Sequence, residues 1–273
     1  MGVFMKKVLL TGAAGGVAQM LRPLLVARYR NIVLSDRTVV TDLVDGESFI
    51  LADLSDPASL AGALKGVDRV IHLGGRSVEG TWDEVLQANI IGLHNFYEAC
   101  RAAKVRRVVF ASSNHAAGFY PRNQRIGVDR RTRPDSRYGV SKVFGEAMAS
   151  LYADKFGISS LSIRIGNIGP MPLDTRRLSI WLHPEDMMQL CEIGLEHPDI
   201  HSQIVWGMSD NDREWWDNQV AYDLGYRPSH QGEEYAEIAM SGDGPPDPVG
   251  DVLQGGGFCS AEFNGVLERA QKS

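Results

Sequence analysis

Tyr138 and Lys142, four residues apart, could form a device that transfers a proton. Spacing i, i+4 puts both side chains on one face of a helix. A tyrosine with a pKa near 10 is a poor base at neutral pH, but a neighbouring ammonium favours its phenolate by Coulomb attraction. Such a pair also occurs by chance on a protein surface, which is the alternative interpretation. The motifs that precede this pair favour the catalytic one: a glycine-rich turn, Asp36, Asn89 and Ser113.

The glycine-rich turn lies between an apolar run at residues 8–10 and a segment of helical length, in Thr11-Gly12-Ala13-Ala14-Gly15-Gly16-Val17-Ala18. Glycines let the backbone approach a pyrophosphate, and the start of a helix offers free N–H groups and the positive end of its dipole to that anion. An ordinary strand-to-helix turn is the alternative. The turn predicts a dinucleotide site with contacts from Gly12, Ala14, Gly15, Gly16 and Val17.

Asp36 ends the second apolar run, roughly two dozen residues after Gly12. Dinucleotide-binding folds place there the carboxylate that accepts hydrogen bonds from the ribose. A carboxylate repels a 2′-phosphate, so Asp36 predicts NAD over NADP, although the adjacent Arg37 tempers that argument. The predicted cofactor contacts further along the chain are Arg37, Asp53, Leu54, Leu73, Gly74, Gly75, Asn89, Lys142 and Ile165.

Six apolar runs of strand length alternate with segments of helical length, at residues 8–10, 32–34, 49–51, 70–73, 108–111 and 161–165. Residues 81–101 and 138–156 have amphipathic helical spacing. Because buried parallel strands are short and apolar on both faces, the pattern predicts an α/β fold with a doubly wound parallel sheet of the Rossmann type.

The alternation loosens after residue 165. A helix over 184–195, which His183 would begin, and a strand at 204–206 are predicted, whereas residues 243–248 and 255–257 have the Gly and Pro content of turns. A length of 273 residues fits one large α/β domain or two small ones. We expect a single Rossmann-type domain over residues 1–273, in which residues from about 166 to 273 contribute a small lobe on the substrate side.

Composition and charge exclude several classes of protein. The chain is 44% hydrophobic and 23% charged, as globular proteins are, and its net charge of −6 disfavours nucleic acid as a partner. Three cysteines without metal or disulfide spacing fit a reducing cytoplasm. Residues 1–7 lack a signal-peptide pattern and no apolar run approaches the length of a membrane span, so we expect neither export nor a membrane anchor.

The motif set resembles the short-chain dehydrogenase/reductase superfamily, in its extended branch, across about residues 7–226. The resemblance implies that Tyr138 is the acid/base, that Lys142 lowers its pKa and holds the nicotinamide ribose, and that Ser113 orients the reacting hydroxyl. Asn89 matches the proton-relay asparagine of the superfamily. Ala18 stands at the third position of the glycine motif, a departure that leaves these expectations unchanged.

A narrower resemblance is carried by residues 112–120, by Arg164-Ile165-Gly166-Asn167 and by Pro170, Arg176, Leu178, Ser179 and Trp181. These residues resemble the uronate dehydrogenases, a family that oxidises the C1 hemiacetal of a hexuronate such as glucuronate or galacturonate with NAD. The resemblance implies that Arg176 binds the C6 carboxylate and that the sugar is lined by Ser77, Ser113, Asn114, His115, Tyr138 and Asn167. It implies no metal, and we expect a homo-oligomer.

Several residues keep a structural alternative. His115 could hold its loop through a backbone bond, and His72, inside an apolar strand, is interpreted as a core histidine. Charge alone leaves the carboxylate to either Arg176 or Arg177, since both offer a bidentate guanidinium. Tryptophans more often pack in a core or an interface than against a substrate, and we interpret Trp206, Trp215 and Trp216 in this way.

Two other functions remain open at the level of sequence. One is a sugar-nucleotide epimerase or reductase of the same superfamily, which the short C-terminal part disfavours. The other is a protein that senses NAD without turnover, and such proteins commonly lack the tyrosine and lysine present here. The sequence does not specify which hexuronate epimer is preferred.

Overall fold

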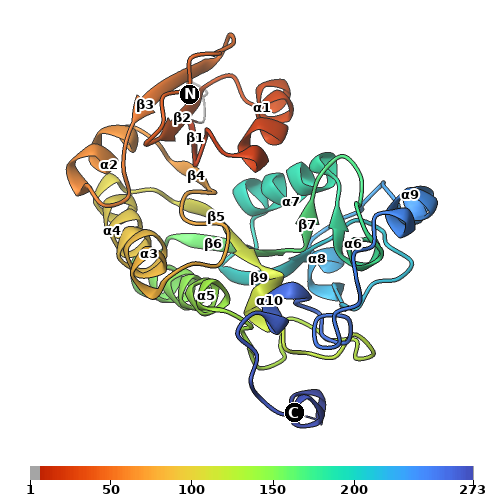
Figure 1. Ribbon diagram of the computed structural model, residues 1–273. Helices are drawn as coiled ribbons and strands as arrows, with labels where there is room; N and C mark the ends of the chain where they lie inside the picture. Colours follow the sequence, from red (N-terminus) through yellow and green to blue (C-terminus); the bar gives the residue numbers. More distant parts are fainter. Residues whose placement is uncertain (1–6, 273) are drawn as a thin grey trace.

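The computed structural model describes residues 7–272. Residues 1–6 lie outside this described part, and most of the expectation about a signal peptide depends on them. A seven-stranded sheet with the order β3-β2-β1-β4-β5-β6-β9 forms the middle layer (Figure 1). Its strands are β1 (Val8–Thr11), β2 (Ile32–Asp36), β3 (Glu47–Leu51), β4 (Arg69–His72), β5 (Arg107–Ser113), β6 (Ser159–Ile165) and β9 (Ser202–Gly207). All neighbours pair in parallel, which confirms the predicted doubly wound sheet.

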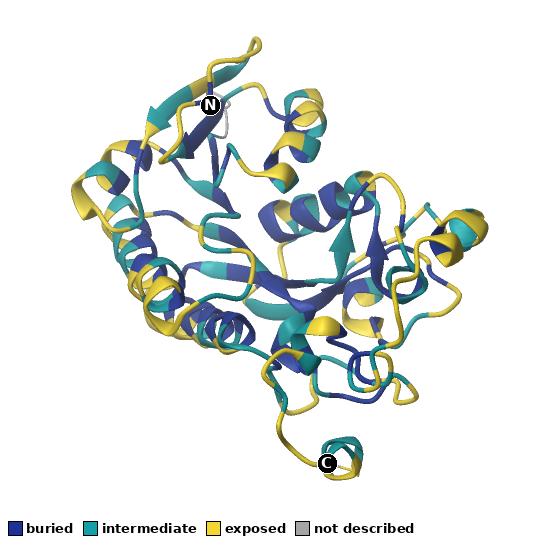
Figure 2. Ribbon diagram, viewed as in Figure 1, coloured by how far each residue is buried: buried dark blue, intermediate teal, exposed yellow. Residues whose placement is uncertain are grey.

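Helices cover both faces of this sheet (Figure 1). One face carries α1 (Gly16–Arg28) and α7 (Pro184–Glu196), and the other carries α2 (Pro57–Ala63), α4 (Gly92–Ala103) and α5 (Arg137–Phe156). Neighbouring residues of β1 belong to different cores: Val8 packs with α1 and α7, whereas Leu9 packs with α4 and α5. The central strands β1, β4 and β5 and the neighbouring β2 are therefore mostly buried on both faces, as Figure 2 shows, which explains why their sequences are apolar without alternation, whereas the edge strand β3 is half-buried to exposed.

The predicted helix over 81–101 is divided in the structure. α3 (Trp82–Val85) leads into a π-helical segment, η1 (Leu86–Ile91), and then into α4. Thr81 and Glu84 begin this stretch with a reciprocal capping box. Wide π-type turns inside helices occur frequently at functional sites, and this one contains Asn89.

Part of the segment after residue 166 completes the sheet, because β9 pairs with β6 and α7 packs on the same face as α1. The substrate-side lobe expected over about residues 166–273 stays a prediction, and β9 and α7 would not belong to it. Its short elements are β7 (Asn167–Ile168), α6 (Thr175–Ile180), β8 (Trp181–Leu182), α8 (Gln219–Asp223), η3 (Gly232–Tyr235), α9 (Ala236–Ser241), α10 (Gly257–Ser260) and α11 (Leu267–Lys272).

Most of the residues for which the sequence suggested a structural role have that role in the structure. His72 is buried, stacks on Phe96 and lies 2.7 Å from Thr11 Oγ1, so it is a core histidine with a polar partner. The side chain of His183 accepts a hydrogen bond at the start of α7. The tryptophans pack in one cluster, where Trp206 and Trp216 stack with ring centroids 4.3 Å apart and Trp215 lies against them. None of the helices described in residues 7–272 has the length and apolarity that crossing a bilayer requires.

Candidate active site

The glycine-rich turn joins β1 to α1 and presents open backbone. Gly12 has a φ of +69°, and a Cβ there would lie 2.8 Å from the backbone of Leu73 and Gly74, so only glycine fits. Gly15 is the N-cap of α1 without a side-chain cap, and the first turn of α1 holds no acidic residue. A Cβ at Gly16 would meet nothing within 4 Å. This uncapped helix terminus suits a pyrophosphate, as the sequence predicts.

Asp36 lies beside this turn at the end of β2. Its Oδ2 accepts from the Ala14 N–H at 3.1 Å, and its Oδ1 accepts from the Thr38 N–H at 2.9 Å. Each carboxylate oxygen keeps a further acceptor site, so a ribose can bind there. Val17 lies half-buried in the first turn of α1. The remaining predicted contacts of this region lie just beyond the ends of neighbouring strands: Arg37 is exposed, and Asp53, Leu54, Leu73 and Gly74 are half-buried.

Asn89 holds the loop that follows β4. Its Oδ1 accepts from the Arg76 N–H at 2.7 Å, while its Nδ2 donates to Arg76 O at 3.0 Å and to Ser141 Oγ at 2.9 Å. Gly75 has a φ of +123°, and a Cβ there would lie 2.7 Å from Asn89 Oδ1. The amide thus connects helix α5 to the loop that carries the exposed Ser77.

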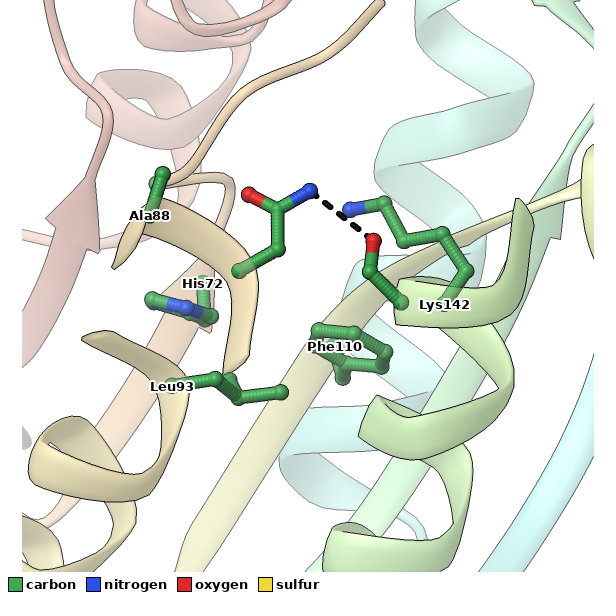
Figure 3. A pocket seen from close by; sticks show the side chains of 8 residues that line it. His72, Ala88, Leu93, Phe110 and Lys142 are labelled. Atoms are coloured by element: carbon green, nitrogen blue, oxygen red, sulfur yellow. Dashed lines mark hydrogen bonds between the residues drawn. The ribbon is translucent and has the colours of Figure 1, made fainter. Parts of the chain in front are cut away.

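Tyr138 and Lys142 lie on the first turns of α5, as their spacing predicts. Lys142 Nζ donates to Ala111 O at 2.7 Å and lies 5.3 Å from the centroid of the Tyr138 ring. Figure 3 shows Lys142 together with His72, Ala88, Leu93 and Phe110 around a small cavity under the loop after β4. Lys142, one helical turn after Tyr138, therefore meets residues that lie 32 to 70 positions earlier in the sequence.

Burial acts on both members of this pair. It raises the pKa of Tyr138 to about 12, although a hydrogen bond with Ser113 acts in the opposite direction. It lowers the pKa of Lys142 to about 8, although Glu146 acts to raise it. At pH 7 the tyrosine is a neutral phenol and the lysine is mostly an ammonium. Desolvation of the tyrosine outweighs the lowering of its pKa that we expect from Lys142.

His115 follows β5, and a carboxylate holds its side chain, while its backbone carbonyl accepts from the Asp135 N–H at 3.3 Å. Its Nδ1 lies 2.7 Å from Oδ2 of the buried Asp135. Its ring stacks on Phe258 at a centroid distance of 3.9 Å and meets the Tyr138 ring edge to face at 5.8 Å. The histidine, the tyrosine and Phe258 thus share one aromatic wall.

Arg176 and Arg177 differ in their partners. Arg177 pairs with Asp174, three residues earlier. Arg176 donates from Nε and Nη2 to Gln254 O at 3.0 and 2.8 Å. Turning the Asn114 amide over, so that both of its ends find hydrogen-bond partners, places its oxygen 3.1 Å from Arg176 Nη2. Among the ion pairs of residues 7–272, none involves Arg176.

The guanidinium of Arg176 is therefore a half-buried cation that contacts neutral groups. Burial lowers its pKa to about 10, which leaves it charged at neutral pH. Asn114, between Ser113 and His115, donates its amide N–H to Ile165 O at 3.2 Å. Asn167 lies half-buried in β7. The structure thus connects Arg176 to residues 113–115, beside Tyr138.

Sequence reasoning missed four residues of this site. Asp135, Gln254 and Phe258 hold His115 and Arg176, and Glu79 accepts hydrogen bonds from the Tyr138 N–H and from Arg137 Nη1, both at 2.9 Å. The triple glycine at 255–257 was the available signal. A Cβ at position 255 would lie 1.9 Å from Asp135 Oδ2, and one at position 256 would lie 2.6 Å from Arg176 Nε. Gly255 and Gly256 therefore do more than form a turn: they let this C-terminal segment pass close to Asp135 and Arg176.

Residues 8–217 match the NAD dependent epimerase/dehydratase family. The chain belongs to this family. The match spans the glycine-rich turn, Asp36 and the Tyr138–Lys142 pair, and it confirms the expected branch of the superfamily.

Within the family, the chain is similar to uronate dehydrogenases. It is 42% identical to the uronate dehydrogenase of Pseudomonas syringae pv. tomato over 93% of this chain and 94% of the relative. It is also similar to the crystal structure of glucuronic acid dehydrogenase from Chromohalobacter salexigens, with a TM-score of 0.90 and 42% identity over 93% of this chain and 97% of that one. A uronate dehydrogenase of Agrobacterium tumefaciens, a tyrosine-to-alanine variant in complex with NAD, gives a TM-score of 0.89 and 40% identity over 94% and 97%.

Proposed function

We propose that this chain oxidises the C1 hydroxyl of a hexuronate, such as glucuronate or galacturonate, to the aldarolactone with NAD as the acceptor. The observation that carries the proposal is Arg176, a half-buried guanidinium without a carboxylate partner among residues 7–272, joined through Asn114 to Ser113 and His115. A cation in such a place favours an anionic ligand, because a bidentate carboxylate would satisfy its charge. Similarity to proteins named for uronate and glucuronic acid oxidation supports the same substrate class.

The residues of the β1–α1 turn fit NAD. The uncapped terminus of α1 at Gly15 and Gly16 would hold the pyrophosphate, and Asp36 would hold the adenosine ribose. Lys142 would hold the nicotinamide ribose. When bound, NAD supplies the acceptor for the hydride that leaves C1.

On the substrate, Ser113 orients the C1 hydroxyl, and Tyr138 in its phenolate form receives the hydroxyl proton as the hydride leaves C1, so that C1 and its oxygen form the carbonyl of a lactone. This step requires the pKa of Tyr138 to fall from about 12, and the Lys142 ammonium supplies a stabilising positive charge for the phenolate. Arg176 binds the C6 carboxylate at the other end of the sugar. Its task is to hold the substrate in register, because little new charge develops at C6.

An NADH absorbance assay with purified protein tests this function. Glucuronate and galacturonate should be oxidised, whereas glucose, which lacks the carboxylate, should be a poor substrate. Turnover of a UDP-sugar with no turnover of free uronates would favour the epimerase or reductase alternative. Binding of NAD without turnover of any sugar would favour the sensing alternative.

We also propose that the enzyme is a cytoplasmic homo-oligomer. Large apolar side chains are exposed on the neighbouring elements α3, η1 and α5: Trp82, Ile91, Val140, Leu151 and Phe156. Apolar side chains exposed on adjoining helices can be buried between two copies of a chain. Light scattering after gel filtration should give a mass above that of one chain, and Leu151→Glu should lower it; a monomeric native protein would contradict the proposal.

A further inference from the structure

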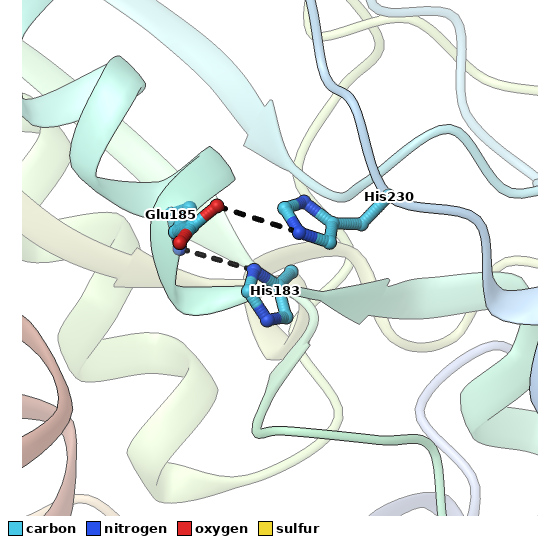
Figure 4. A group of neighbouring side chains, drawn as sticks. All are labelled: His183, Glu185 and His230. Carbon is cyan, nitrogen blue, oxygen red and sulfur yellow. Dashed lines mark hydrogen bonds and ion pairs between the residues drawn. The ribbon is translucent and has the colours of Figure 1, made fainter.

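A second group of ionisable side chains lies outside the proposed active site. His183 and Glu185 lie at the start of α7, and His230 lies in the loop before η3 (Figure 4). One ring nitrogen of each histidine and one carboxylate oxygen of Glu185 lie within 4.8 Å of one another. The two imidazoles stack with centroids 3.5 Å apart, and His230 Nε2 lies 3.5 Å from Glu185 Oε2.

The hydrogen bonds around the two imidazoles orient them toward Glu185. His183 Nδ1 accepts from the Glu185 N–H at 3.3 Å, so this nitrogen carries a lone pair on the side of Glu185. His230 Nδ1 lies 3.3 Å from Oδ1 of Asp186, which is buried and also accepts from the Ser229 N–H at 3.0 Å. A carboxylate behind one ring nitrogen fixes a histidine so that its other nitrogen can bind a metal.

We propose that His183, Glu185 and His230 bind one divalent transition-metal ion of the zinc class. Two imidazole nitrogens and a carboxylate form a donor set that suits zinc, with water as the fourth ligand. The three ligand atoms must move together to reach bonds of about 2.0–2.2 Å, and the Glu185 side chain, 60% exposed, is free to do so. On binding, the ion takes the place of the weak hydrogen bond from the Glu185 N–H to His183 Nδ1. It also displaces any proton that His230 and Glu185 share.

Such an ion would join α7 of the sheet layers to the loop at residues 228–231. The site shares no residue with the proposed active site, so binding and stability are the direct readouts. The sequence predicted no metal, because His183 and His230 are 47 residues apart and only the fold brings them together.

The chain contains a matched control for the first half of this site. His197 also precedes a proline, and its Nδ1 accepts from the Asp199 N–H at 3.3 Å, as His183 does from Glu185. Within residues 7–272, however, only His183, Glu185 and His230 form a group with metal-ligand spacing. His197 therefore accepts the same kind of hydrogen bond as His183, but within residues 7–272 it has no second histidine and carboxylate at metal-ligand spacing.

Isothermal titration of tag-free, chelator-treated protein with zinc chloride tests the proposal. The native protein should bind one ion per chain, Glu185→Gln and His230→Asn should weaken this binding at least tenfold, and His197→Asn should leave it unchanged. Magnesium chloride should give no binding, since the site offers nitrogen ligands. Zinc should raise the Tm of the native protein and of His197→Asn, but not the Tm of Glu185→Gln or of His230→Asn.

Two results would overturn the metal site: no uptake of zinc by the native protein, or the same affinity in Glu185→Gln and His230→Asn as in the native protein. Because the Glu185 side chain lies at the surface and its backbone N–H remains, Glu185→Gln keeps the fold and gives a decisive answer even if His230→Asn does not fold.

Discussion

The cofactor side and the sugar side of the proposed site are built in opposite ways. On the cofactor side, a glycine-rich turn and an uncapped helix present backbone N–H groups, and Asp36 is the main charged side chain. On the sugar side, groups far along the chain hold the side chains: the Asp135 carboxylate fixes His115, and the backbone carbonyl of Gln254 fixes Arg176. The first side depends on local geometry, whereas the second depends on contacts between residues as many as 143 positions apart, as His115 and Phe258 are.

Replacing Tyr138, where the two sides meet, should have the largest effect. Tyr138→Phe removes the group that accepts the proton but leaves the β1–α1 turn intact. We expect kcat to fall by roughly 10² to 10⁴, while the Kd for NAD, measured by fluorescence titration, stays within about twofold, as expected for a turn left untouched. A variant that retains half of the native kcat would refute the proposed role of Tyr138.

Arg176→Ala should break the sugar side alone. A charge-assisted bidentate pair is worth on the order of 2–4 kcal/mol, so kcat/KM for glucuronate should fall by roughly 30- to 1,000-fold, mostly through KM. Arg176→Lys should restore only part of the lost kcat/KM, because the point charge of an ammonium does not reproduce the planar, bidentate guanidinium. Activity on glucose should change little.

Arg177→Ala is the matched control, since Arg177 is already paired with Asp174. It should keep nearly native kinetics with both uronates. Loss of activity in Arg177→Ala with retention in Arg176→Ala would move the carboxylate site by one residue, and no effect of either would argue against a uronate substrate.

Asp36→Ala should alter the cofactor side alone. The native protein should prefer NAD, because an unpaired contact between Asp36 and a 2′-phosphate costs on the order of 1–3 kcal/mol. Removing the carboxylate should narrow the ratio of kcat/KM for NAD over NADP by a corresponding factor of roughly 5 to 150. Equal use of both cofactors by the native protein would show that Asp36 does not select between them.

Replacing His72 should have a smaller effect, which concerns the pH dependence of the free energy of unfolding. Burial lowers its pKa to about 3, so protonation favours the unfolded chain, and the stability that neutral His72 contributes above pH 6.5 is lost as pH falls toward 3. Between pH 7.5 and 5.5, urea unfolding should show the native protein losing about 1.4 kcal/mol more than His72→Asn, whose amide oxygen can replace Nδ1 near Thr11. Equal losses would show that His72 does not titrate in this way.

The sequence predicts the elements around the proposed cofactor side, because their signals are local. The order strand, glycine turn, helix, strand and acid covers residues 8–36, and each step depends on neighbours in the chain. The pairing of His115 with Asp135 and the tail contacts at Gln254 and Phe258 require the tertiary fold. For the same reason the different partners of Arg176 and Arg177 are visible only in the structure, and the assignment of the carboxylate to Arg176 stays a prediction.

The position of Gln254 and Phe258 has a consequence for how the protein is made. Domains fold from the N-terminus as synthesis proceeds, so β1 to β6 and the glycine-rich turn emerge from the ribosome before these residues exist. A nascent chain halted near residue 250 would carry the whole cofactor side, while Arg176 and His115 would lack the groups that hold them. The preference for a sugar is thus the last property that the growing chain acquires.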